Sequence, residues 1–279
     1  IGSSYAGVML NSQHNFAWIT AGANNAIDTS RENGAATILV TGAGRRYLIA
    51  SNIELQRMLD EQVDGTLFEP IEFKWQDEKA QPDLVKLLAG DLAHGQVIAD
   101  IPFTSAPALE SIFSYQRFEL TDDEIVRYRA LGNDATAAIA STVKGLKQGQ
   151  TENEIANAMR HELGRRNINS VVTLVAADER IAKYRHPVPT DNRFDKTLLL
   201  VTCAKRHGLV ASVSRMISIG VPTEELILKT DAAAFVHATL QNAMRKAVNP
   251  DTNGSALYEA ARNAYERSGF PDEINKHHQ

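Results

Sequence analysis

The chain has 279 residues, which at roughly 150 residues per domain predicts about two domains. Apolar residues make up 43% and charged residues 23% of the sequence, a globular balance that excludes disordered and collagen-like chains. The 29 basic and 34 acidic residues give a net charge of -5. Without a basic surplus to neutralise phosphates, nucleic acid is not an expected partner.

The longest apolar stretch, Thr197 to Ala204, is far shorter than the ~20 residues that a membrane-spanning helix needs. No membrane partner is therefore expected. The single cysteine, Cys203, cannot form an internal disulfide, which fits a reducing compartment and predicts a cytoplasmic location. The chain begins at Ile1 instead of methionine, so the sequence does not test for a targeting segment.

A β-hairpin is predicted early in the chain. Two β-type runs, Ala36–Val40 and Tyr47–Ser51, flank the turn residues Thr41–Arg46. Gly42 and Gly44 also suit a dinucleotide-binding loop, but that motif needs a third glycine and an immediately following helix. A second strand follows here, so the hairpin is the favoured interpretation.

Amphipathic stretches accompany these strands. The apolar spacing in Ile53–Glu61 and Asp83–Ala89 predicts two helices. Between residues 101 and 118, prolines and serines interrupt any periodicity. Residues 1–118 are therefore predicted to form a small α/β domain, and residues 119–279 a second domain.

The second domain is predicted to begin with a long helix. Thr121 and Glu124 form a capping box, in which each side chain bonds the exposed backbone N–H of the other residue. Apolar residues then recur on one helical face, from Ile125 and Tyr128 through Leu131 to Ile139.

The second domain also contains a possible internal duplication. The segment 150–169 opens with another capping box, Thr151 to Glu154, and residues 257–270 resemble it at a shift of 102 residues. Each segment follows an alanine-rich helix, and the first runs into the β-type Ser170–Ala177. A domain built from two related halves commonly places its cleft between them.

No strong catalytic signature appears from spacing alone, because G-x-S-x-G, H-E-x-x-H and C-x-x-C are all absent. His186 lies in the loop YRHPVPT, where Pro187 and Pro189 restrict the backbone. A stiffened loop could aim a general base, or the loop could be a tight turn with an incidental histidine. The terminal His277 and His278 are a second candidate, with a solvated tail as the alternative.

The order of elements from about residue 119 resembles the pita-bread fold of methionine aminopeptidase, prolidase, aminopeptidase P and creatinase. Four features carry the resemblance: the capped segment GQTENEIANAMRHELGRRN, the His186 loop, the paired strands Leu198–Val201 and Val210–Ile219 around Gly208, and the closing helix with HHQ. Residues 1–118 resemble the smaller α/β domain that precedes it in prolidase, aminopeptidase P and creatinase. The implied fold is an α/β domain followed by an α+β pita-bread domain of two pseudo-symmetric halves.

The resemblance also implies a departure at the metal site. The family's metal enzymes carry two aspartates eleven residues apart, ahead of a Thr-Arg pair. Aligning Gly208 and the Ser214-Arg215 pair with that pattern puts Val201 and Ser212 at the aspartate positions. Neither side chain supplies the anionic oxygen that divalent metals need in such sites. No cofactor is predicted, and a bound divalent metal is not expected.

The remaining residues point toward creatinase, which hydrolyses a C–N bond without metal. The resemblance implies that His186 acts as acid and base, with His278 as a second catalytic residue and His277 and Arg215 beside the substrate. For Arg215, an ion pair that supports the sheet is the favoured role. The chain ends directly after the region of the family's metal-binding histidine, so the later strands are expected to be missing and two family glutamates would lie beyond Gln279.

These observations favour a metal-independent hydrolase that acts on a small amide, amidine or peptide. One alternative is a catalytically inactive pita-bread binding module, as in the aminopeptidase-like domain of a histone-chaperone subunit. Another is an Xaa-Pro metallopeptidase, of the Xaa-Pro dipeptidase or aminopeptidase P kind, by ancestry only. The family resemblance also implies a homodimer.

Overall fold

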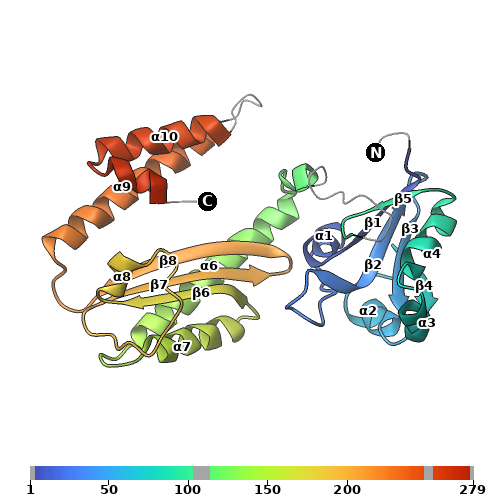
Figure 1. The fold of residues 1–279 in the computed structure, drawn as a ribbon, viewed down its shortest axis with the longest axis horizontal. Helices are drawn as coiled ribbons and strands as arrows, with labels where there is room; N and C mark the ends of the chain where they lie inside the picture. The colour runs from blue at the N-terminus through green and yellow to red at the C-terminus, as the bar shows by residue number, and fades with distance from the viewer. Residues whose placement is uncertain (1–3, 103–113, 248–253, 277–279) are drawn as a thin grey trace. The chain divides into compact units, whose positions relative to one another are not determined.

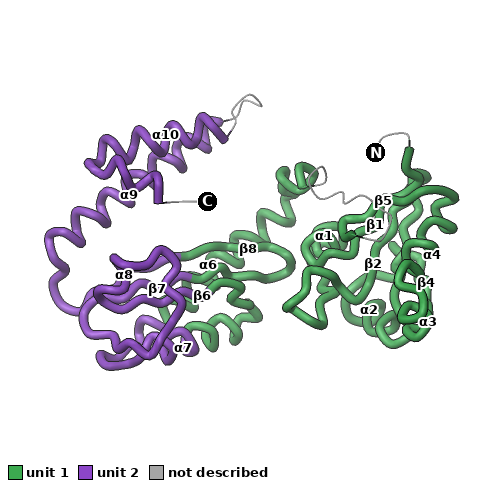
Figure 2. The backbone as a smooth tube through the Cα atoms, viewed as in Figure 1, with its two compact units in different colours: residues 1–141, 159–172, 202–213 green, residues 142–158, 173–201, 214–279 purple. Residues whose placement is uncertain are grey.

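The computed structural model describes residues 4–102, 114–247 and 254–276 (Figure 1). Contacts divide the chain into two compact units, one made of residues 1–141, 159–172 and 202–213 and the other of residues 142–158, 173–201 and 214–279 (Figure 2). The domain boundary near residue 118 stays a prediction. Among the helices of the described ranges, none combines the length and apolarity that a membrane span requires.

The first unit contains a five-stranded mixed sheet with the strand order β4-β3-β2-β1-β5. Its strands are β1 (Gly7–Ser12), β2 (Asn33–Thr41), β3 (Arg46–Ser51), β4 (Glu69–Phe73) and β5 (Val97–Ala99). β2 pairs antiparallel with both β1 and β3, whereas β4 and β5 run parallel to β3 and β1, respectively. The predicted hairpin is confirmed, because β2 and β3 are paired from Ala36↔Ala50 to Val40↔Arg46.

Helices cover both faces of this sheet (Figure 1). They are α1 (Gln13–Ile19), α2 (Leu55–Glu61), α3 (Trp75–Ala80) and α4 (Leu84–Ala93). Neighbouring residues of a strand point to opposite faces, and β1 shows the consequence: Leu10 packs in a cluster with residues of α1 and α2, whereas Met9 packs in a cluster with residues of α4. The predicted α/β character and the two predicted helices are thereby confirmed.

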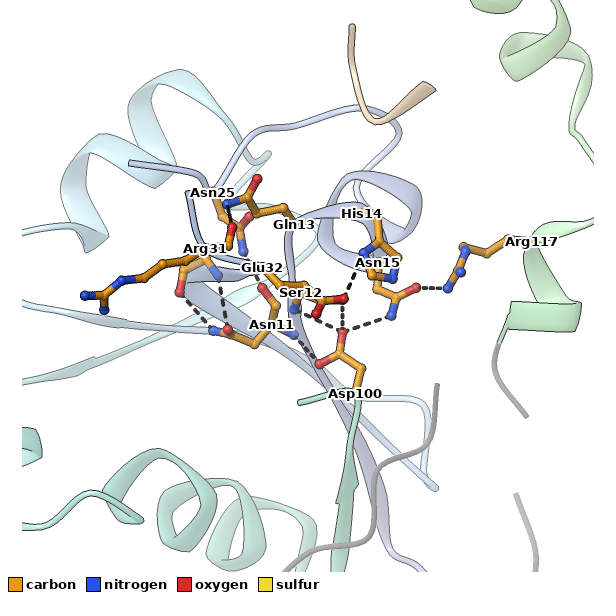
Figure 3. Close-up of polar contacts among 11 residues, drawn as sticks. Asn11, Ser12, Gln13, His14, Asn15, Asn25, Arg31, Glu32, Asp100 and Arg117 are labelled. Carbon is orange, nitrogen blue, oxygen red and sulfur yellow. Dashed lines mark hydrogen bonds and ion pairs between the residues drawn. The ribbon is translucent and has the colours of Figure 1, made fainter. Parts of the chain in front are cut away.

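A buried polar cluster lies where β1 and β5 end (Figure 3). The Asp100 carboxylate accepts hydrogen bonds from the backbone N–H of Asn11 at 2.8 Å and of Ser12 at 3.0 Å. It also accepts from the Ser12 hydroxyl at 2.5 Å and from Asn15 Nδ2 at 3.0 Å. Asn15 Oδ1 in turn accepts from the Arg117 guanidinium. This cluster therefore links β1, α1 and β5 to the 3-10 helix η1 (Ser114–Arg117).

The second sheet has three strands in the order β6-β7-β8. They are β6 (Asn169–Ala177), β7 (Thr197–Arg206) and β8 (Leu209–Ser218). The accompanying helices are α6 (Asp122–Lys144), α7 (Glu152–Gly164) and the short α8 (Arg180–Lys183). Within the first unit, α6 is bonded to this sheet: the Tyr128 hydroxyl donates to the Val210 carbonyl at 2.7 Å, and Asp134 forms an ion pair with Arg206 at 2.7 Å.

Both predicted capping boxes are present. The Thr121 hydroxyl accepts from the backbone N–H of Glu124 at 3.3 Å, and the Glu124 carboxylate accepts from the Thr121 N–H at 2.8 Å. Thr151 and Glu154 form the same pair of bonds, at 3.1 and 2.8 Å. These reciprocal bonds satisfy backbone donors in the first turns of α6 and α7.

The predicted duplication is confirmed at the level of secondary structure. Helix α9 (Glu224–Lys246) begins and ends 102 residues after α6, and α10 (Gly254–Arg267) begins 102 residues after α7. The first repeat continues into strand β6, whereas the second continues into the 3-10 helix η2 (Pro271–Lys276).

Candidate active site

Of the two positions expected to hold aspartates, Val201 is partly exposed in β7 and Ser212 is exposed in β8. Residues of β7 alternate between buried and partly exposed, and Val201 and Cys203 belong to the partly exposed set. A two-residue turn, His207-Gly208, joins β7 to β8, with φ values of 51° and 77°. Positive φ at both turn positions is the geometry of a tight hairpin, in which the turn fixes the register. Across this hairpin, Cys203 Sγ of β7 lies 3.3 Å from Ser212 Oγ of β8.

These side chains do not fit the two-metal centre that the family resemblance implies. Val201 has no donor atom, Ser212 offers a neutral hydroxyl, and Cys203 offers a soft thiol. Paired divalent metals in oxygen-rich sites need carboxylates to offset their charge. Throughout residues 4–102, 114–247 and 254–276, no three or more His, Cys, Asp or Glu side chains are grouped in a way that could hold a metal ion.

His186 lies in the loop between α8 and β7, and its side chain is exposed. The next residue, Pro187, is buried, and its carbonyl accepts a hydrogen bond from the β6 residue Val175 at 3.2 Å. The predicted stiff loop is thus fastened to the edge of the second sheet by backbone bonding as well as by its prolines. Whether His186 acts as a general base stays a prediction.

Glu152, the first residue of α7, fastens the same loop from inside. Its side chain is completely buried. The carboxylate accepts from the backbone N–H of Ala177 at 2.8 Å and from the N–H and hydroxyl of Thr190 at 2.9 and 2.7 Å. It also forms an ion pair with Arg180. One carboxylate therefore connects α7, the end of β6, the start of α8 and the His186 loop.

A second carboxylate fixes the far end of the loop. Asp178 takes a positive φ of 50° directly after β6. It accepts from the backbone N–H groups of Asp195, Lys196 and Thr197 at 2.9, 2.9 and 2.8 Å. The loop thus enters β7 in a fixed position.

Both carboxyl groups are held in their charged form. Burial by itself raises the pKa of Glu152, but hydrogen bonds from Arg180, Ala177 and Thr190 outweigh it, and the pKa lies below its ordinary value. Burial likewise raises the pKa of Asp178, and the backbone N–H donors around it lower that pKa further than burial raises it. Hydrogen bonds to the charged form favour that form.

The remaining predicted residues are distributed as follows. Arg215 lies in β8 with an exposed side chain, and its guanidinium donates to the Ser214 carbonyl at 2.7 Å. His277 and His278 lie outside the described residues. The predicted roles of His277 and His278, and the predicted ion pair of Arg215, stay predictions.

Sequence reasoning missed Glu152, Arg180 and Asp178. Glu152 stands inside the Thr151–Glu154 capping box, where an acidic residue is expected to be solvated and to favour the helix start. Its partners Ala177 and Arg180 are 25 and 28 residues away. No local spacing signals such a connection, so only the folded structure identifies it.

Comparison with known proteins agrees with this architecture. The sequence profile of metallopeptidase family M24 matches residues 127–278. No curated protein matches the chain. Among solved structures, an X-Pro aminopeptidase from Thermotoga maritima is 18% identical with a TM-score of 0.72, and the match covers 96% of this chain and 77% of that chain.

Two further structures give the same result. A prolidase from Pyrococcus horikoshii is 18% identical with a TM-score of 0.68, and the match covers 96% of this chain and 75% of the prolidase chain. The dipeptidase PepE from Mycobacterium ulcerans is 14% identical with a TM-score of 0.71, and the match covers 96% of this chain and 73% of the dipeptidase chain. At these identities the likeness establishes the fold, and it confirms the expected pita-bread architecture. Since the family profile matches more than half of the chain, this protein belongs to metallopeptidase family M24.

Proposed function

We propose that this chain is an M24 protein that hydrolyses a C–N bond of a small amide, amidine or peptide without the family's two-metal centre. The observation that carries the proposal is the pair Val201 and Ser212, which occupies the positions where the family pattern places metal-binding aspartates. Matching structures that are named as an aminopeptidase, a prolidase and a dipeptidase support a substrate of the peptide class.

In the proposed reaction His186 performs the proton transfers. An imidazole changes its charge near neutral pH and so suits general acid–base catalysis. His186 takes a proton from a water molecule as the water oxygen forms a bond to the scissile carbon. The C–N bond then breaks, and the same proton passes to the leaving nitrogen. His278 or His277 would polarise the scissile group.

The fixed loop supports this role. A general base must be held near the proton that it removes, and misplacement by about 1 Å can cost ~100-fold in rate. Pro187 is anchored to β6, and Glu152 and Asp178 hold the residues that follow. An exposed imidazole on an anchored loop can meet substrate without first being ordered.

The test is turnover of a panel of Xaa-Pro dipeptides, other small peptides and guanidino compounds before and after chelation. We expect activity that survives chelation and is lost in His186→Ala. His161→Ala is the matched control, because His161 is an exposed histidine on α7 outside the loop. Activity that disappears with chelator and returns with manganese or cobalt would overturn the proposal.

A binding module is the second candidate. The partly exposed side of β7 is uncharged at Leu199, Val201 and Cys203, a surface suited to holding a peptide without reacting with it. This candidate predicts no turnover and a peptide affinity that His186→Ala leaves almost unchanged. A hydrolysis rate that this substitution abolishes would dismiss it.

Three further expectations belong to the proposal. A metallopeptidase activity of the usual kind is disfavoured by the donor set, although the ancestry is that of the family. We propose a homodimer on the family resemblance. The single cysteine of the chain and its net charge of -5 support a cytoplasmic protein with no nucleic-acid partner.

A further inference from the structure

Glu152 is a buried charge that the proposed reaction does not use. A fully buried carboxylate is costly unless it is paired and hydrogen-bonded. Here Oε1 accepts from Ala177, and Oε2 accepts from Thr190 twice and from Arg180. The backbone N–H of Glu152 also donates to the Asn192 carbonyl at 2.9 Å. Both the side chain and the backbone of Glu152 are therefore hydrogen-bonded to the loop.

Arg180 extends this connection to both sides of His186. Its second guanidinium nitrogen donates to the Val188 carbonyl at 3.1 Å. The guanidinium carbon lies 5.3 Å from the centroid of the Tyr184 ring, within the ~6 Å of a cation–π contact. Tyr184 and Val188 are each two residues from His186 in the sequence. A single arginine thus fixes the loop before and after the histidine.

The Arg180 side chain depends on Glu152. It is only 13% exposed, and Glu152 is its ion-pair partner. If the carboxylate is removed, a mostly buried guanidinium loses its counter-charge and is expected to turn toward water. The contacts to Val188 and Tyr184 would then be lost together.

We infer that Glu152 is a positioning residue that holds the His186 loop through Arg180. The catalytic consequence rests on the proposed function, in which His186 moves the proton. The mechanical part, that Glu152 sets the position and order of His186, is independent of any turnover. Asp178 does not have this role, because its bonds hold residues 195–197 at the far end of the loop.

The experiment compares Glu152→Gln with Glu162→Gln in the full chain. Both substitutions remove a carboxylate from α7 that pairs with arginine, since Glu162 contacts Arg166 at 2.9 Å. Three quantities are measured: the NMR signal of the His186 ring, assigned by its loss in His186→Ala; amide hydrogen exchange at Val188; and kcat and KM on any substrate found in the panel.

In Glu152→Gln we expect a shifted or broadened His186 ring signal and Val188 exchange at least ~10-fold faster, because local opening becomes easier. We also expect kcat to fall at least ~10-fold with KM changed by less than about threefold, the result of misplacing a catalytic group. Glu162→Gln should match the wild type in all three.

Failure of this inference and failure of the proposed function can be told apart. A folded Glu152→Gln variant with a wild-type His186 signal and wild-type exchange would overturn the inference, whether or not the protein turns over substrate. Absence of turnover in the wild type would count against the proposed function alone. If Glu152→Gln does not fold, Arg180→Lys replaces it: this variant keeps the charge beside Glu152 but loses the forked contacts, and it must show the same ring and exchange changes.

Discussion

The two repeats, α6–α7 and α9–α10, have helices that match in sequence position but differ in how much of their surface is buried. In the first repeat, α6 and α7 each bury several apolar residues, and the chain continues into β6. The buried residues are Leu131, Ala135, Ala138, Ile139, Ile155, Ala156, Met159 and Leu163. In the second repeat, α9 buries Val236, and α10 buries Ala261 and Ala264.

This difference shows how much of a helix's stability comes from what covers it. Short and medium helices are marginal on their own, and most of their stability in proteins comes from packing an amphipathic face. The Glu152 side chain, at the start of α7, accepts four hydrogen bonds from neighbouring elements. Gly254 begins α10 at the equivalent position, and a Cβ added there would meet no atom within 4 Å. The first repeat is thus predicted to be the stable part that positions the site.

The largest expected effect concerns those two equivalent positions. Glu152→Ala leaves Arg180 without its buried partner, and breaking such a pair costs about 3–5 kcal/mol in the free energy of unfolding. Gly254→Ala should change it by less than about 1 kcal/mol, toward greater stability, because alanine is the better helix former. Urea unfolding of both variants measures the contrast. Equal losses in the two would show that the repeats are equally well packed.

Core packing gives the next contrast. Leu131 of α6 is 1% exposed, so Leu131→Ala should cost about 2–5 kcal/mol through lost burial and a residual cavity. Leu228 of α9 is 60% exposed, and Leu228→Ala should stay within about 0.5 kcal/mol. The shift of the urea midpoint at unchanged slope checks both values. A loss at Leu228 as large as that at Leu131 would mean that α9 is buried in solution.

Acidification should weaken the first repeat through Glu152. Its pKa is lower in the folded chain than the ordinary value of 4.5, so its contribution to stability is complete above that value and is lost as pH falls through the folded pKa. The stability difference between the wild type and Glu152→Gln should therefore be constant near neutral pH and shrink below about pH 4.5. Unfolding curves between about pH 7 and pH 3 test this, and a difference independent of pH would contradict it.

The smallest contrast lies in the helix caps. Thr121 takes part in a full capping box. The hydroxyl of the equivalent Thr223 of α9 accepts from the Leu226 N–H at 3.2 Å, but a leucine side chain has no oxygen with which to complete the box. Thr121→Ala should cost about 1 kcal/mol and Thr223→Ala about half as much. The melting temperatures of the two variants measure this difference, and a larger loss of stability in Thr223→Ala than in Thr121→Ala would contradict the prediction.

The features predicted from sequence are those with local signals. The hairpin turn at residues 41–46 and the Thr121 capping box each depend on residues a few positions apart, and both are present. Strand β7 extends to Arg206, five residues beyond the predicted Val201. Its polar end continues as strand because the tight turn at His207-Gly208 keeps it paired with β8.

The candidate site was predictable only in part. The loop of His186 could be read from its prolines, but the bonds that hold it come from Glu152 and Asp178. Glu152 reaches across 38 residues to Thr190. Such contacts depend on how α7, β6 and the loop are brought together, and a residue's type does not reveal which of many acidic side chains will be buried. The expectation that Val201 and Ser212 stand at the family's aspartate positions depends on a family pattern that says where to look, and it stays a prediction.

The central claim, that catalysis does not use the family's paired metal ions, is tested most directly by elemental analysis. The full chain is incubated with manganese, cobalt or zinc, dialysed, and measured alongside its activity on the substrate panel. We predict that no metal is retained above background and that the turnover rate is the same with and without added metal. A pair of ions retained per chain, with turnover that depends on them, would contradict the account.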